Sequence, residues 1–326
     1  MTKHLLAFIL LGALAPGLRA AEDVTAAAGF AFPSIQDGAG ARAIALGSTY
    51  VGIDEGSTAL LWNPAGLGAL SEPEIAENHN SAILGSTQDI AVVALPIGEE
   101  NGLGLSLNYE NDGTFDGRDS SGDETGSYSA DAYGGSLGWG AGVGGGLYLG
   151  LDLKYEQESL GGTDLDSFAG DFGALWNFSP LFSLGAAYDN VGPAVKGWQM
   201  DRGLNVGLSS HFYDSDSSQW LAAVSGQCLS DGDSSLHFGI EDTLYTLLSL
   251  RVGYAYSASN SDYSDLLGWT FGIGLAIHRV SLDYAYVPLS DLGSMQRVSL
   301  SYAFGGQQIQ PNPDTQPNQP PAAAQQ

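Results

Sequence analysis

The sequence predicts an all-β protein, a transmembrane antiparallel β-barrel of about 14 strands with a small N-terminal helical plug. Beyond residue 75, apolar residues alternate with small or polar ones. The length of these segments is close to the roughly 9–11 residues that a tilted membrane strand needs. Glycine makes up 46 of 326 residues and aromatic residues 10%, against 14% charged, which favours strands and turns over a soluble helical protein. No run after the leader reaches the roughly 20 apolar residues of a spanning helix.

Residues 1–20 have the pattern of a secretory signal peptide. Lys3 and His4 precede an apolar run, and small residues follow up to Ala20, so we expect cleavage after Ala20 or Ala21. The alternative is a helical anchor, which is less favoured because the run is short. The single cysteine, Cys228, excludes a lipoprotein anchor and an internal disulfide; we expect it to be a small apolar residue on a strand.

Residues 41–70 form the one long segment without strand alternation. Its pattern predicts helices at 41–46 and 57–62, followed by the turn Asn63-Pro64-Ala65-Gly66-Leu67. Asn63 can cap a last helical turn that begins at Pro64, because the missing proline N–H needs no partner at that position. So small a unit has too little core to stand alone. We therefore expect residues 21–75 to form a plug inside the structure that the strands build.

Residues 76–304 are expected to form the barrel. The alternation is clearest from Leu147 to Glu156 and from Trp269 to His278. A soluble sandwich also alternates, but the export signal, the strand lengths and the aromatic residues near strand ends favour a barrel. Strands are predicted near 76–84, 88–97, 101–110, 128–141, 145–157, 167–178, 181–190, 202–213, 219–229, 234–241, 247–258, 267–277, 279–287 and 295–304.

The connections between these segments alternate in length, as expected for short periplasmic turns and longer outer loops. Short ones are predicted at 98–100, 142–144, 179–180, 214–218, 242–246 and 278. Mostly longer ones are predicted at 111–127, 158–166, 191–201, 230–233, 259–266 and 288–294. The short connection at 85–87 breaks the alternation, and the first strand has the weakest pattern.

The last predicted strand ends with Tyr302 and Phe304, which resembles the terminal signal by which the barrel assembly machinery recognises outer-membrane barrels. Residues 305–326 are rich in Gln and Pro and lack an apolar pattern, so we expect a disordered periplasmic tail. A plain linker is favoured there over an interaction segment. The predicted location is the outer membrane of a Gram-negative type of cell, with both termini periplasmic.

Acidic residues dominate the charge of the chain. The formal net charge is −27, which makes nucleic acid an implausible partner. The acidic residues are concentrated in the predicted loops, where the favoured interpretation is that they keep the loops soluble. Divalent-cation binding is the alternative, although no run has the spacing of an EF-hand. The loop acids are Asp112, Asp116, Asp119, Asp123, Glu124, Asp214, Asp216, Asp231 and Asp233.

The sequence predicts no enzyme. The strand pattern turns a set of charged residues toward the lumen, where we expect them to pair with each other rather than to act as general acids and bases. The histidines are scattered without ligand spacing, so no metal site is predicted, and neither a GxSxG motif nor a phosphate-binding loop is present; no cofactor is expected. The inward charged residues are Asp152, Lys154, Glu156, Asp171, Asp189, Arg251, Asp283 and Arg297; the histidines are His79, His211, His237 and His278.

The plug segment carries a family resemblance. It resembles the N-terminal signature of the PorV/PorQ-type outer-membrane proteins, relatives of the long-chain fatty-acid transporter FadL, whose plug has a similar Asn-Pro-Ala turn. The match spans about thirty residues and the strand pattern covers most of the rest. The matching residues are Arg42, Ala45, Leu46, Gly47, Tyr50, Asp54, Ser57, Asn63, Pro64, Ala65, Gly66 and Leu67.

The resemblance implies two functions of different classes. The first is a channel for hydrophobic or amphipathic small molecules, in contact with outer-membrane lipid. Its ligand or gate residues would be Arg42, Asp54, Asn63, Pro64, Ala65, Gly66 and Leu67. The second is a PorV-like shuttle or binding subunit of a type IX-like secretion system, whose partner would be a secreted cargo protein. A structural outer-membrane protein without transport is the third possibility.

Overall fold

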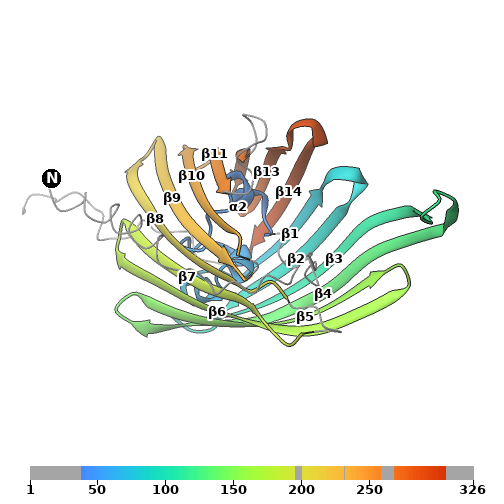
Figure 1. Ribbon diagram of the computed structural model, residues 1–326. Helices are drawn as coiled ribbons and strands as arrows, with labels where there is room; N and C mark the ends of the chain where they lie inside the picture. Colours follow the sequence, from blue (N-terminus) through green and yellow to red (C-terminus); the bar gives the residue numbers. More distant parts are fainter. Residues whose placement is uncertain (1–37, 195–199, 231, 258–267, 306–326) are drawn as a thin grey trace, which may run out of the picture.

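Fourteen antiparallel strands form a closed barrel, in which each strand pairs with its sequence neighbours and β14 pairs with β1 (Figure 1). The computed structural model describes residues 38–194, 200–230, 232–257 and 268–305. The signal peptide, residues 21–37 of the plug segment, Asp231 and nearly all of the C-terminal tail lie outside the described residues. The strands are β1 (Glu74–Ser81), β2 (Thr87–Pro96), β3 (Asn101–Arg118), β4 (Glu124–Gly144), β5 (Leu147–Leu160), β6 (Thr163–Ser179), β7 (Phe182–Val191), β8 (Gly203–Ser215), β9 (Ser218–Leu229), β10 (Ser234–Leu244), β11 (Leu248–Ser257), β12 (Trp269–Ile277), β13 (Val280–Pro288) and β14 (Ser294–Ala303).

The predicted alternation decides which side chains face out. On β3, Leu105 and Leu107 are 48% and 60% exposed, whereas Ser106 between them is 3% exposed. An apolar outer face with small and polar residues inside is the arrangement of a barrel in lipid. No helix among the residues that the structure describes has the length and apolarity to cross a membrane.

The two ends of the barrel differ in their connections. One end, called the turn end here, has the connections 97–100, 145–146, 180–181, 216–217, 245–247 and 278–279, each within a few residues of a predicted short turn. The opposite end is called the loop end. Two loops predicted at that end, 111–127 and 158–166, were wrong, because strands occupy most of them. β3 continues to Arg118 and β4 begins at Glu124, while β5 continues to Leu160 and β6 begins at Thr163. Polar residues carry no penalty once a hairpin leaves the lipid, so its ladder of hydrogen bonds continues.

The first strand also differs from its predicted position. It covers Glu74–Ser81 instead of 76–84, and a 3₁₀ turn, η4 (Ile83–Gly85), occupies the predicted strand end. Leu84 has φ 57°, a left-handed conformation outside the extended region of a regular strand, and β1 ends before it. β1 is therefore a short strand of 8 residues.

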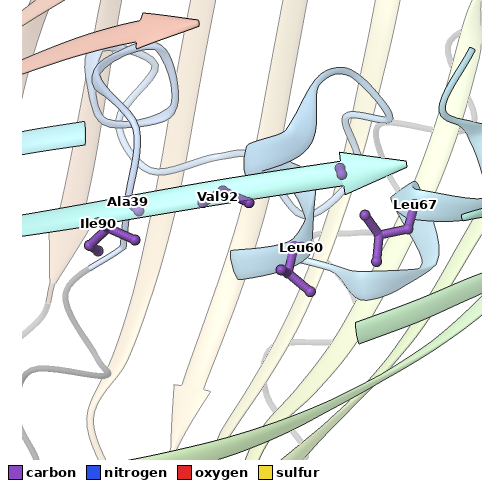
Figure 2. Close-up of a cluster of buried hydrophobic side chains, with 6 residues drawn as sticks. Ala39, Leu60, Leu67, Ile90 and Val92 are labelled. Atoms are coloured by element: carbon purple, nitrogen blue, oxygen red, sulfur yellow. The ribbon is translucent and has the colours of Figure 1, made fainter. Parts of the chain in front are cut away.

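The plug lies inside the barrel (Figure 1). It contains α2 (Ala41–Ala45) and two 3₁₀ helices, η2 (Ser57–Leu61) and η3 (Pro64–Ala69), so the second predicted helix is 3₁₀ rather than α. Asn63 caps η3 as predicted, and its side chain accepts a hydrogen bond from the Ala65 N–H at 3.2 Å. Leu60 and Leu67 are fully buried, and Figure 2 shows them beside Val92 of β2.

Candidate functional site

A floor of glycines supports the predicted Asn63–Leu67 turn. Four inward glycines on consecutive strands face one another in register, Gly102 with Gly140, Gly140 with Gly150, and Gly150 with Gly173. A Cβ atom added at Gly140 would lie 2.6 Å from both the Pro64 carbonyl oxygen and the Gly68 nitrogen. The plug backbone thus rests directly on the sheet, an approach that only glycine permits.

The rest of the plug backbone meets the wall in the same way. Gly185 of β7 and Gly207 of β8 are paired, and the plug residues Val51 and Gly52 lie against them. Gly239 of β10 and Gly253 of β11 are also paired, and Leu46 and Gly47 lie against that pair. Glycines on opposite sides of the barrel therefore hold the plug by close backbone contact.

Asn63 joins three parts of the molecule. Its side-chain amide donates to the carbonyl oxygen of Val51 at 2.7 Å and to that of Ala174 on β6 at 3.0 Å, and the residue is 1% exposed. Asp54, another predicted site residue, accepts a hydrogen bond from Asn177 of β6 at 2.6 Å. These bonds fix the predicted turn to the wall; Pro64, Ala65, Gly66 and Leu67 are all buried there.

Arg42 ties the plug to the opposite wall through charge. Its guanidinium donates to both carboxylate oxygens of Glu241 on β10, at 2.7 and 2.9 Å, and also to Glu55. Glu241 in turn accepts from Arg251 of β11, which reaches Asp283 of β13 at 2.5 Å. The Arg42 charge holds the pKa of Glu55 well below its usual range. A continuous ion network therefore fastens α2 to the wall and includes Arg251 and Asp283, two of the residues expected in the lumen.

Three more of the expected lumen residues, Asp152, Lys154 and Glu156, lie on β5. Lys154 forms an ion pair with Asp171 at 2.5 Å and donates to Asn190 at 3.2 Å. Glu156 accepts a hydrogen bond from Asn108 at 2.8 Å. Asp152 is fully buried, close to Gly138 and the plug residue Leu60.

A bulge in β7 shapes the same wall. The register between β6 and β7 shifts at Asp189 and Asn190, and Asn190 has φ 62°. Bulges re-aim side chains, and here Asp189 and Asn190 both line the lumen. Asp189 accepts from Asn205 of β8 at 2.6 Å. The inward position of Asp189 was predicted and that of Asn190 was not. The break in alternation at Asp189-Asn190-Val191-Gly192 is the signal in the sequence that indicates it.

A cavity of about 170 Å³ separates the plug from this wall. One side of it is apolar and consists of Leu61 and Trp62 of the plug with Ile90 of β2. The Trp62 indole donates to the Ala39 carbonyl oxygen at 2.8 Å, which fixes its ring. The other side is polar and consists of Lys154, Glu156, Asp189, Asn190, Asn205 and Gln227. The cavity is therefore amphipathic. The sequence pattern did not predict Trp62 as a lining residue.

The arrangement does not indicate a metal centre. Within the described ranges, no three His, Cys, Asp or Glu side chains are grouped so that they could hold an ion. His211 contacts Glu55 at 3.0 Å, His237 contacts the Gly47 carbonyl oxygen at 2.7 Å, and His79 contacts Asp89 on the outer surface. Cys228 lies on β9 as a free, exposed thiol.

The fold is shared with several solved structures of other proteins. The Pseudomonas putida toluene transporter TodX aligns with a TM-score of 0.61 at 14% identity, over 82% of this chain and 98% of its own. The Ralstonia pickettii toluene transporter TbuX aligns with a TM-score of 0.58 at 15% identity, over 82% of this chain and 97% of its own. A Pseudomonas aeruginosa FadL homologue aligns with a TM-score of 0.51 at 13% identity, over 81% of this chain and 96% of its own. No family model matches the sequence, and neither does any curated protein.

At these identities the likeness shows the fold alone. The predicted resemblance is therefore supported at the level of a FadL-like barrel, whereas the narrower PorV/PorQ resemblance has no support from these structures. Two of these structures are described as toluene transporters.

Proposed function

We propose that this protein is an outer-membrane channel for hydrophobic or amphipathic small molecules, with both termini in the periplasm. The observation that carries the proposal is the amphipathic cavity between the plug and the wall of a FadL-like barrel. Two structures with this fold are described as toluene transporters, which agrees with an apolar cargo. The export-subunit and purely structural alternatives gain no support from any of these observations.

The cavity suggests the size and polarity of the cargo. A cavity of about 150 Å³ can hold benzene, so about 170 Å³ suits a molecule with one ring or a short alkyl chain. Its apolar part would pack on Trp62 and Ile90, and a polar group would meet Asn205 or Gln227 on the other side. The lining residues Asn190, Gly203 and Leu229 lie at the loop-end termini of β7, β8 and β9, so the solute would enter from the loop end.

The Asn63–Leu67 turn would act as the gate. It would close the lumen by lying on the glycine floor of β3 to β6, and it contains no charged side chain that could form an ion pair with the wall. Arg42 and Asp54 would keep the remainder of the plug attached while the turn shifts. Passage then requires loss of backbone packing and of the Asn63 bond to Ala174 in one segment, and it leaves the ion network in place.

Uptake across an intact outer membrane tests the proposal. Gram-negative cells that lack their own channel for apolar solutes would express wild type, a deletion of 41–70, or Trp62→Ala, and take up a radiolabelled alkylbenzene. We expect wild-type uptake above empty cells, faster uptake with the deletion, and a shift toward larger rings with Trp62→Ala. Trp220→Ala, whose side chain lies on the outer surface near Phe212, is the matched control. Uptake equal to that of empty cells for every apolar solute would refute the channel.

A further inference from the structure

The outer surface of β1 and β2 carries a polar patch, called the β1 patch here and made of Glu77, His79 and Asp89. Glu77 is exposed, and the side chains of His79 and Asp89 are 49% and 48% exposed. The His79 Nδ1 atom contacts Asp89 Oδ1 at 2.6 Å. The outward positions of β12 show the usual composition for comparison: Phe271, Ile273, Leu275 and Ile277.

Glu77 is opposite Leu300 and His79 is opposite Val298, both exposed on the outer face of β14, so the β1 patch lies within the apolar band that lipid covers. β1 has 8 residues, and Glu77 is the fourth and His79 the sixth. At about 3.4 Å per residue and a tilt of about 40°, the whole strand rises about 21 Å, less than the apolar band of about 25 Å on such barrels. Ionisable side chains in that band are costly when they face lipid. Contact with lipid alone is therefore energetically unfavourable for the Glu77 side chain.

The register prevents these side chains from turning inward. Asn78 and Asn80, which alternate with them, are buried, and Asn78 donates to the Ile90 carbonyl oxygen at 3.1 Å. Glu77 is opposite Leu300 on β14 and Ala91 on β2, so its outward neighbours within the chain are an apolar and a small side chain. The small Ala91 leaves room beside Glu77 for another molecule.

We propose that the β1 patch is the contact surface for a second copy of this chain. A twofold axis along the membrane normal brings β1 against β1 of the partner at the same depth. Glu77 and His79 are two residues apart, about 7 Å along the strand, which their side chains together can span. Each Glu77 then meets His79 of the other copy, so the patch complements itself, as an isologous interface requires.

The hydrogen bonds support this pairing. Asp89 occupies the Nδ1 side of His79, and no hydrogen-bond partner of its Nε2 is found in the part of the chain that the structure describes. A protonated His79 would donate from Nε2 to a Glu77 carboxylate. A neutral His79 with its proton on Nδ1 would accept at Nε2 from a protonated Glu77. The pair is therefore satisfied in either state, and two such pairs form per dimer.

Site-directed cross-linking in reconstituted membranes tests the proposal. In a Cys228→Ser background, Ser81→Cys places a thiol on the exposed outer face of β1, and Phe238→Cys places one on the exposed outer face of β10. We expect a short bismaleimide to yield covalent dimers from Ser81→Cys alone. Equal yields at both positions, or monomers only, would overturn the proposal. A cross-linked product of any mass other than a dimer would point to a different membrane protein and overturn it as well.

Sedimentation in mild detergent provides a second measurement. The double variant Glu77→Leu/His79→Leu should raise the dimer dissociation constant about tenfold or more, since it removes hydrogen bonds to charged groups. Leucine suits lipid, so the barrel should keep its heat-modifiable migration on gels. An unchanged dissociation constant in a folded barrel would refute the contact. The matched control, Leu250→Ala on the outer face of β11, should leave the dimer intact.

Discussion

The glycine floor provides the sharpest test of how the plug closes the lumen. In Gly140→Ala, the new methyl group would begin 2.6 Å from the Pro64 oxygen and the Gly68 nitrogen, whereas ordinary contact starts at 3.4 Å. Both neighbours are backbone atoms of the plug and cannot rotate away. The Asn63–Leu67 turn must therefore lift by about 0.8 Å, the difference between these distances. Overpacking of this kind costs about 1–3 kcal/mol, which shifts the docked equilibrium by about 5- to 150-fold.

The assay is the conductance of single channels in planar bilayers, together with uptake of the alkylbenzene. We expect Gly140→Ala to open more often than wild type and to take up solute faster. Gly170→Ala on β6 is the control, because a methyl group there meets nothing nearer than 3.5 Å and does not touch the plug. If Gly140→Ala stays as closed as the control while both fold, the plug does not rest on the floor as described.

Three further predictions concern the attachment of the plug. Arg42→Ala should weaken docking of the plug by about 2 kcal/mol, measured as protease cleavage within 38–70. Arg42→Lys should recover only part of this loss, because lysine cannot reproduce the two-oxygen contact with Glu241. Equal protection from the protease in wild type and both variants would contradict the prediction. Asn63→Ala should cost about 2 kcal/mol by removing the cap and two bonds to buried carbonyl oxygens, seen as faster amide exchange of 63–69 with α2 unchanged as the internal control. The folded pKa of Glu55 is depressed, so its ion pair stabilises docking at and above the ordinary glutamate pKa and is lost only as pH falls well below it. Below the ordinary histidine pKa, where His211 beside Glu55 no longer changes charge, conductance should therefore stay flat from about pH 6 to about 4.5, whereas Glu55→Gln should be leaky over that range. A rise near pH 5 in wild type would show that Arg42 does not hold Glu55.

Sequence and structure agree where the pattern is local. The period of two places Leu105 and Leu107 outside and Ser106 inside, and it needs only the pleat of a strand. The cap at Asn63 also depends on neighbouring residues, so the turn and its first residue, Pro64, were predicted. The loops at 111–127 and 158–166 were mispredicted because acidic and glycine-rich composition indicates a turn, although two such segments can still pair as a ribbon in water.

The candidate site depends on contacts that no local pattern encodes. Arg42 was recognised, but its partner Glu241 lies 199 residues away, and only the closed barrel brings them together. The same holds for the glycine floor, because hydrogen-bond register aligns glycines from four strands under one turn. The sequence by itself determined which residues of the regular strands face lipid and which face the lumen, since each side chain's direction follows from its own strand; the exception is Asn190, which the bulge in β7 turns inward. The tertiary structure alone decided which inward residues meet the plug and leave a cavity beside Trp62, because strand tilt and register are properties of the whole barrel.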